Sequence, residues 1–176
     1  MLSIRNATAA DAALILGFVR LLAEYEREPK AVVATEEDFL RDGFGPEPKF
    51  RCLIADWDNR PAGFALFFYK YSTWHGKPGL YLEDLFVIPE MRGKGIGKAL
   101  LEKLAQIALE ANCFAMAWMV LKWNEPAIKF YESLGAVAMD AWETMRIMRP
   151  ALEQLAKRRD NSSPQAEATS SGGSRK

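Results

Sequence analysis

The chain has 176 residues, of which 49% are hydrophobic and 26% are charged, a composition typical of a globular protein rather than a disordered or fibrous one. At this length about 70% of the surface of the unfolded chain can be buried, so a core can form without disulfides or a metal. The formal net charge is zero, which argues against binding driven by the charge of nucleic acid.

The charges are unevenly distributed along the chain. Residues 157–176 hold five basic and two acidic side chains, so residues 1–156 hold 18 basic and 21 acidic ones. Residues 161–176 contain no Leu, Ile, Val or aromatic residue and cannot bury enough surface to offset the entropy of ordering. We expect one domain over residues 1–156, mildly acidic and suited to a cationic small molecule, followed by a disordered tail over residues 157–176.

Metal and export signals are missing from the sequence. Cys52 and Cys113 are far apart and His75 is the single histidine, so no zinc or haem spacing is present. No apolar run approaches 18 residues, and residues 1–5 have neither a basic nor an apolar leader segment. We expect a protein without a metal that stays in the cytoplasm, away from membranes, with both cysteines as thiols.

The first half of the chain predicts a short strand, two helices and a hairpin. Leu2 and Ile4 alternate with polar residues, and residues 8–11 resemble a capping box that opens a helix. Thr35 is placed to cap a second helix, which we expect to stop at Gly43. Residues 50–57 and 62–71 predict strands joined by a turn at residues 58–61.

The second half continues the alternation of strands and helices. We expect strands at residues 80–88, 115–121, 136–139 and 142–148. A helix that begins at Ile96 and one that Asn124 caps, over residues 125–134, separate them. The predicted order β-α-α-β-β-β-α-β-α-β-β indicates an α/β fold with a mixed sheet of about seven strands and about four helices.

The glycine-rich segment at residues 92–97 predicts an anion site. It links a strand to a helix N-terminus, where glycines allow close approach and the first-turn N–H groups face the ligand. A Walker A loop is excluded because Arg92 stands where its first glycine is required, and Ala99 where Ser or Thr is required. The dinucleotide fingerprint fails because Leu100 stands at its third glycine. A protein that binds ATP or NAD is therefore disfavoured.

Arg92-x-x-Gly95-x-Gly97 after an apolar strand resembles the acyl-CoA pyrophosphate loop of the GCN5-related N-acetyltransferase (GNAT) superfamily. The predicted order of elements is also that of the GNAT fold, whose central sheet is mixed and twisted. Further segments resemble the branch of spermidine/spermine N1-acetyltransferases and thialysine acetyltransferases. These segments are residues 22–26, 42–45, 81–87, 92–97, 123–126, 130–131 and 134–136.

The resemblance implies an N-acetyltransferase that moves an acetyl group directly from acetyl-CoA to a primary amine of a small cationic acceptor. It also implies a homodimer. Glu83 would be the general base and Tyr131 the acid that protonates the CoA thiolate. We assign Asp84 a structural role, since adjacent strand residues point to opposite faces of a sheet.

The resemblance also implies two sets of binding residues. Those expected to bind acetyl-CoA are Leu85, Phe86, Val87, Arg92, Gly93, Lys94, Gly95, Ile96, Gly97, Lys98, Asn124, Glu125, Pro126 and Tyr131. Those expected to face the acceptor are Tyr25, Glu26, Trp74, Glu83, Asp140 and Trp142. Leu85, Phe86 and Val87 would act through main-chain groups, one of which would polarise the thioester carbonyl.

The identity of the acceptor stays open at this point. The polyamine enzymes of the branch have Tyr-Asp-Pro-Trp where residues 71–74 read Tyr-Ser-Thr-Trp, so a carboxylate for a distal ammonium is missing at Ser72. A shorter diamine or a lysine-like amine is favoured over spermidine. The alternatives are an acyl-CoA-binding module without turnover, or a GNAT enzyme for an amino acid, an antibiotic or a protein N-terminus.

Overall fold

The fold is built on one five-stranded sheet, which the computed structural model of the chain places in the order β1-β2-β3-β4-β5. Neighbouring strands are antiparallel from β1 to β4, whereas β4 and β5 are parallel. The expected α/β class with a mixed sheet is confirmed. The strands are β1 (Leu2–Asn6), β2 (Arg51–Trp57), β3 (Arg60–Ser72), β4 (Lys77–Val87) and β5 (Met116–Trp118).

The structure describes residues 1–139 and 141–157, and the chain divides into two compact units, Met1–Asn124 and Glu125–Lys176. The single domain expected over residues 1–156 stays a prediction, and the expected tail beyond residue 157 lies outside the described residues. The first unit also holds η1 (Ala9–Asp11), α1 (Ala12–Tyr25), α2 (Glu36–Phe44), η2 (Pro89–Met91) and α3 (Ile96–Glu110). The second holds α4 (Glu125–Ser133) and α5 (Arg149–Lys157).

The expected strand count is too high. The described residues of segments 136–139 and 142–148 form no hydrogen-bonded ladder, so the described sheet has five strands and not seven. β-rich sequence alone does not make a strand, because a strand is stabilised by its partner strand. Helix α5, which the sequence analysis did not expect, follows this segment, with Pro150 in its first turn.

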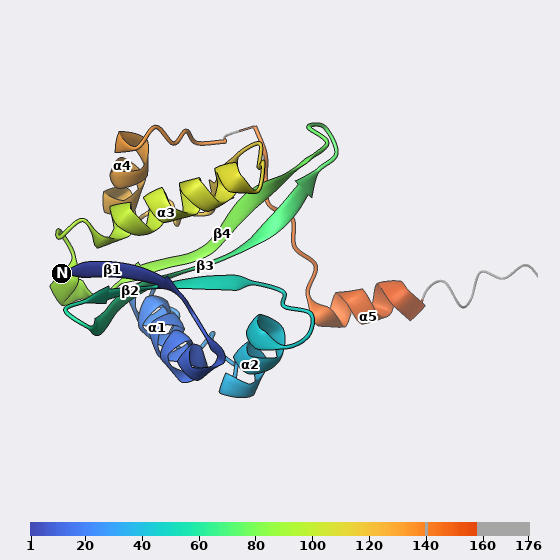
Figure 1. Cartoon of the computed structure of the whole chain (residues 1–176). Helices are drawn as coiled ribbons and strands as arrows, with labels where there is room; N and C mark the ends of the chain where they lie inside the picture. The colour runs from blue at the N-terminus through green and yellow to red at the C-terminus, as the bar shows by residue number, and fades with distance from the viewer. Residues whose placement is uncertain (140, 158–176) are drawn as a thin grey trace, which may run out of the picture. The chain divides into compact units, whose positions relative to one another are not determined.

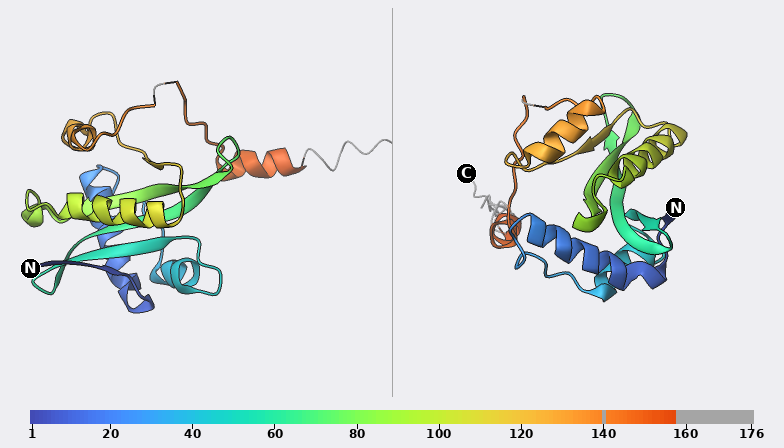
Figure 2. Two further views of the ribbon diagram at one scale, coloured as in Figure 1. Left: turned by 45° about the horizontal axis from the view of Figure 1, so that its top comes forward. Right: turned by 90° about the vertical axis from the view of Figure 1, so that its left-hand side faces the viewer.

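Helices cover both faces of the sheet in the first unit (Figures 1 and 2). Helices α1 and α2 pack on one face, where the ring of Phe18 stacks on that of Phe64 at 5.4 Å between centroids. Helix α3 packs on the other face through buried Leu100 and Leu104. Burying both faces excludes water from the sheet and leaves the loops at the ends of the strands for binding.

Local sequence signals account for most of the boundaries in the first unit. Thr8 and Asp11 form a capping box, and so do Thr35 and Asp38. The turn between β2 and β3 has Asp58 and Asn59 at positive φ, the geometry of a two-residue hairpin turn. These three signals confirm the sequence analysis.

Gly43 does not end α2, which continues to Phe44. A Cβ at Gly43 would lie 2.5 Å from the ring of Phe50. Glycine at this position allows the close approach of that ring and does not terminate the helix.

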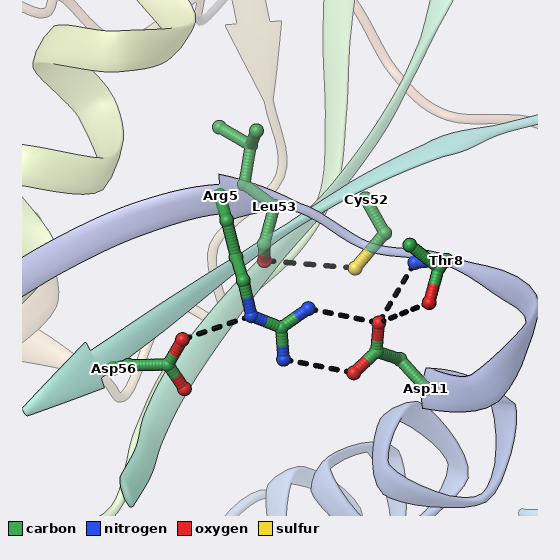
Figure 3. A network of polar contacts seen from close by, with 6 residues as sticks. All are labelled: Arg5, Thr8, Asp11, Cys52, Leu53 and Asp56. Carbon is green, nitrogen blue, oxygen red and sulfur yellow. Dashed lines mark hydrogen bonds and ion pairs between the residues drawn. The ribbon is translucent and has the colours of Figure 1, made fainter. Parts of the chain in front are cut away.

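A polar network ties the start of α1 to the sheet (Figure 3). The Arg5 guanidinium donates to both carboxylate oxygens of Asp11, at 2.9 and 2.8 Å, and to Asp56 at 2.9 Å. These bonds to Arg5 lower the pKa of Asp11 to about 2 despite its burial. Among residues 1–139 and 141–157, no helix is long and apolar enough to cross a membrane.

Candidate active site

Strand β4 contains a β-bulge near its middle. Leu82 lies opposite Phe67 on β3, whereas Asp84 lies opposite Leu66, so Glu83 is an extra residue between the two pairs. A bulge interrupts the alternation of side chains between the two faces of a sheet. The side chains of β4 after Glu83 therefore point to the opposite faces from those that the alternation before Glu83 would predict.

The bulge brings Asp84 to the face covered by α1. Leu66 and Phe86 belong to the core under α1 and α2, and a residue directly opposite Leu66 shares its face. The expectation that Glu83 and Asp84 act on opposite faces relied on strict alternation, which does not hold at this bulge. The charge of Glu83 in fact acts on Asp84.

The charges of two carboxylates act on a third carboxylate beside the end of α1. Burial, followed by the charges of Glu83 and Glu26, raises the pKa of Asp84 to about 6. Glu26 directly follows α1, and burial raises its pKa as well. The charges of Glu83 and Glu26 disfavour ionisation of Asp84, so a cation placed beside these carboxylates would be favoured.

Strand β5 leaves β4 just before the bulge. The two strands pair only where Leu80 to Leu82 face Met116 to Trp118. In the described part of the chain, residues 84–87 of β4 pair with β3 alone. An unpaired strand edge presents N–H and C=O groups that an extended, amide-bearing ligand can bind. Leu85, Phe86 and Val87 lie on this edge.

The loop that follows β4 has the backbone of an anion site. Gly93 and Gly95 have φ of +76° and +80°, the left-handed region that other residues enter at a cost. A Cβ on either would meet no atom within 4 Å, so the backbone conformation and not lack of space requires glycine. Gly95 is also the N-cap of α3, and the first-turn amides there favour an anion.

The remaining residues of the loop anchor it or add positive charge. Ile96 is buried, and Gly97 follows it in the first turn of α3. The ammonium of Lys94 lies 5.3 Å from the ring centroid of Trp57. Lys98 is exposed and pairs with Glu102 at 3.7 Å.

Arg92 fastens the loop to the end of β4. Its Nε donates to the main-chain oxygen of Val87 at 3.0 Å. Its guanidinium carbon lies 4.5 Å from the ring centroid of Tyr25 and 5.6 Å from that of Phe86. The bond from Nε uses one of the five N–H donors of the Arg92 guanidinium. The other four donors are on the two terminal nitrogens, which can bind a phosphate.

Tyr25 joins the end of α1 to Asn124. Its hydroxyl donates to Asn124 Oδ1 at 3.0 Å, and Asn124 is buried. Its ring lies 5.9 Å from that of Trp123, over which the guanidinium of Arg27 lies at 4.6 Å. Asn124 directly precedes α4, where the sequence predicted a capping residue.

Glu125, Pro126 and Tyr131 belong to α4 in the second unit. Glu125 pairs with Lys129 at 3.6 Å on the exposed side of this helix. Tyr131 is half-buried, with its ring 5.4 Å from that of Phe130.

The remaining residues expected to face the acceptor are Trp74, Trp142 and Asp140. Trp74 is 84% exposed in the turn between β3 and β4, at the far end of β4 from the glycine loop (Figure 1). Trp142 is exposed in the second unit. Asp140 lies outside the described residues.

The first unit thus brings together two groups of side chains: the carboxylates of Glu26, Glu83 and Asp84, and the contacts of Tyr25 with Arg92 and Asn124. The sequence analysis missed the place of Asp84, since no turn residue or glycine marks the bulge. In residues 1–139 and 141–157, no three His, Cys, Asp or Glu side chains are grouped to hold a metal ion.

A model of the acetyltransferase (GNAT) family matches residues 15–136. The chain is a GNAT acetyltransferase. The match spans the sheet from β2 to β5, the glycine loop and α4. GNAT acetyltransferases use acetyl-CoA as co-substrate, and an open strand edge that leads to an anion loop fits that molecule.

Two relatives place this acetyltransferase in the expected branch. It is 38% identical to thialysine N-epsilon-acetyltransferase of Bos taurus over 164 residues, which cover 87% of this chain and 96% of the relative. It is 38% identical to spermidine/spermine N(1)-acetyltransferase-like protein 1 of Homo sapiens over 159 residues, which cover 86% of this chain and 23% of the relative.

A solved structure supports the fold. An integron cassette protein from the mobile metagenome of V. cholerae superposes with a TM-score of 0.75 at 29% identity, covering 89% of this chain and 98% of that chain.

Proposed function

We propose that this GNAT acetyltransferase transfers the acetyl group of acetyl-CoA to the terminal primary amine of a lysine-like amino acid or a short diamine. The observation that carries the proposal is the group formed by Glu26, Glu83 and Asp84 beside the open edge of β4. Two ligands of opposite charge fit there together, a cationic amine at the carboxylates and an anionic co-substrate at the glycine loop. Direct transfer between the two follows.

Acetyl-CoA would lie along the open edge of β4. Main-chain groups of residues 85–87 would pair with the amides of its pantetheine arm, and one N–H would polarise the thioester carbonyl. Residues 92–98 would hold the pyrophosphate, with Arg92, Lys94 and Lys98 adding positive charge. Residues 124–126 would contact the arm as well.

The acceptor would bind as an ammonium ion and be deprotonated at Glu83. This carboxylate is exposed at the bulge, so an amine and water can both reach it. Asp84 and Glu26 would hold the cation and draw it from solvent. Glu83 takes one proton, which leaves a lone pair on the amine nitrogen.

The transfer itself makes one bond and breaks one. The amine nitrogen bonds to the thioester carbonyl carbon, the C–S bond breaks and its electron pair leaves with sulfur. Tyr131 donates its hydroxyl proton to the sulfur and is reprotonated from solvent. The products are an amide and the CoA thiol. The nitrogen loses its second proton to solvent as the amide forms, which balances the proton that Tyr131 takes up. Glu83 then passes its proton to water, so one proton is released in total.

Ser72 and the name of the Bos taurus relative support this acceptor class. Ser72 Oγ lies 2.9 Å from Nδ1 of His75 and accepts a hydrogen bond from the His75 amide at 3.3 Å. Ser72 therefore stabilises the turn between β3 and β4, and its side chain has no charge. A long polyamine would find no carboxylate at this position for its second ammonium. The Bos taurus relative is named for thialysine, a lysine-like amine.

The test of this chemistry compares Glu83→Gln with Asp84→Asn and, as a control, Glu47→Gln on an exposed loop. Glu83→Gln should lower kcat on the order of 100-fold at pH 7. Its rate should keep rising toward the amine pKa near 10, because the amine must then arrive deprotonated. Asp84→Asn should mainly raise the amine KM. An unchanged pH profile in Glu83→Gln would remove Glu83 from the mechanism.

Tyr131 is tested separately. Tyr131→Phe should leave the affinity for acetyl-CoA nearly unchanged and lower turnover on the order of 100-fold. Normal turnover would contradict its role as the acid.

We further propose that the enzyme is a cytoplasmic homodimer. Apolar side chains of the second unit support the dimer, since Val137, Met145 and Met148 are exposed and α5 exposes Leu152 and Leu155. A second copy of the chain would cover such surface. The free thiols Cys52 and Cys113 support a reducing compartment. A monomeric mass by light scattering at micromolar concentration would contradict the dimer.

A further inference from the structure

Tyr25 lies where the first unit places two residues expected to contact acetyl-CoA. Its ring lies under the guanidinium of Arg92 at 4.5 Å, and its hydroxyl donates to Asn124 at 3.0 Å. Arg92 and Asn124 are 32 positions apart in the sequence. A single side chain therefore contacts both the loop after β4 and the segment after β5.

These contacts determine how Tyr25 can act. The hydroxyl proton is donated to buried Asn124 Oδ1, and the ring face is covered by Arg92. An ammonium ion cannot stack on the ring face that Arg92 covers, whereas the lone pairs of the hydroxyl oxygen can still accept a hydrogen bond. The contacts with Arg92 and Asn124 thus give Tyr25 a second role, at residues expected to bind the co-substrate, beside the acceptor role that the sequence pattern had implied.

The Arg92 side chain needs such support. It is exposed, and a long flexible side chain loses much rotamer entropy when it binds an anion. The Val87 carbonyl fixes its Nε, and the rings of Tyr25 and Phe86 hold the plane of the guanidinium. An aromatic ring under a guanidinium also contributes a cation–π attraction.

We infer that Tyr25 is a positioning residue for acetyl-CoA: it orients Arg92 through its ring and Asn124 through its hydroxyl. The inference rests on the proposed function, because Arg92 and Asn124 are taken there to contact the co-substrate. Removal of the Tyr25 side chain should weaken CoA binding that is measured without an amine.

Two substitutions separate the two contacts. Tyr25→Phe keeps the ring under Arg92 and removes the bond to Asn124, and Tyr25→Leu removes both. The dissociation constant of CoA, measured by calorimetry without amine, should rise about fivefold in Tyr25→Phe and more than tenfold in Tyr25→Leu. In steady-state assays the KM for acetyl-CoA should rise in the same order.

A matched control uses Tyr69, whose ring lies 5.5 Å from the guanidinium carbon of Arg51 on the same sheet. Tyr69→Leu removes a similar ring from a similar arginine away from the loop, and should leave CoA binding unchanged. In addition, Tyr25→Phe should weaken binding little further in an Asn124→Ala background, because the partner of the hydroxyl is already gone.

The outcomes separate the inference from the proposed function. A wild type that does not bind CoA contradicts the proposed function and, with it, this inference. A wild type that binds CoA, with Tyr25→Leu binding it equally well, overturns the inference alone. An amine KM that rises in Tyr25→Phe while CoA binding stays normal also overturns it, since Tyr25 would then be an acceptor ligand.

Discussion

A carboxylate surrounded by other carboxylates destabilises a folded chain when it ionises. Asp84 is in this position, because burial and the charges of Glu83 and Glu26 raise its pKa to about 6. Between about pH 4 and 6 the folded chain binds more protons at Asp84 than the unfolded chain, so its contribution to stability falls as pH rises through this window.

Asp84→Asn should therefore stabilise the protein in the absence of ligand. At pH 7.5 its free energy of unfolding should exceed that of wild type by up to about 2 kcal/mol, and near pH 4 the difference should shrink. Urea unfolding of both proteins at the two pH values measures this. A difference independent of pH would contradict the raised pKa of Asp84.

Asp11 has the opposite dependence on pH. The hydrogen bond from Arg5 lowers its pKa to about 2, so its ionised form stabilises the fold above about pH 4, and this stabilisation is lost as pH falls toward 2. Asp11→Asn should cost about 2 kcal/mol at pH 7 and progressively less below pH 4. Thermal unfolding at pH 7 and pH 3 tests this prediction, which a constant loss would refute.

At the scale of elements, the sequence predicted what local chemistry determines. The two capping boxes, the turn at Asp58 and Asn59, and the start of α3 after Gly95 all depend on residues within a few positions of each other. The bulge at Glu83 depends on the register between β3 and β4. The expected strands at residues 136–148 required a partner strand that local sequence does not specify.

The same distinction applies to the candidate site. The glycine loop could be predicted because its positive φ angles favour glycine, which the sequence shows at Gly93 and Gly95. The contacts of Tyr25 with Arg92 and Asn124 join three distant segments. No pattern within one segment indicates them.

The loop yields a prediction with a close control. Gly95→Asp adds bulk and negative charge where the pyrophosphate would bind and should abolish the thermal stabilisation by acetyl-CoA, which amounts to about 2.7 kcal/mol at 100 times the dissociation constant. Gly76→Asp, at φ +62° in the turn between β3 and β4 with open space around it, imposes similar strain on the backbone. The stabilisation should persist in Gly76→Asp, and its persistence in Gly95→Asp would disprove the loop assignment.

At the scale of the whole molecule, charge is arranged for two different ligands. The net charge of the chain is zero, yet the bulge gathers Glu83 and Asp84 near Glu26, and the loop after β4 gathers Arg92 and Lys94. Opposite local potentials can draw an ammonium and a pyrophosphate to neighbouring places. This separation of charge follows from the fold and not from composition.

The most direct test of the central claim is the release of CoA from acetyl-CoA with a panel of primary amines. The panel holds thialysine, lysine, ornithine, short diamines, spermidine and spermine. Lysine-like amines and short diamines should have a higher kcat/KM than spermidine or spermine, because no carboxylate at position 72 receives a distal ammonium. A preference for spermine, or no release of CoA with any of these amines, would contradict it.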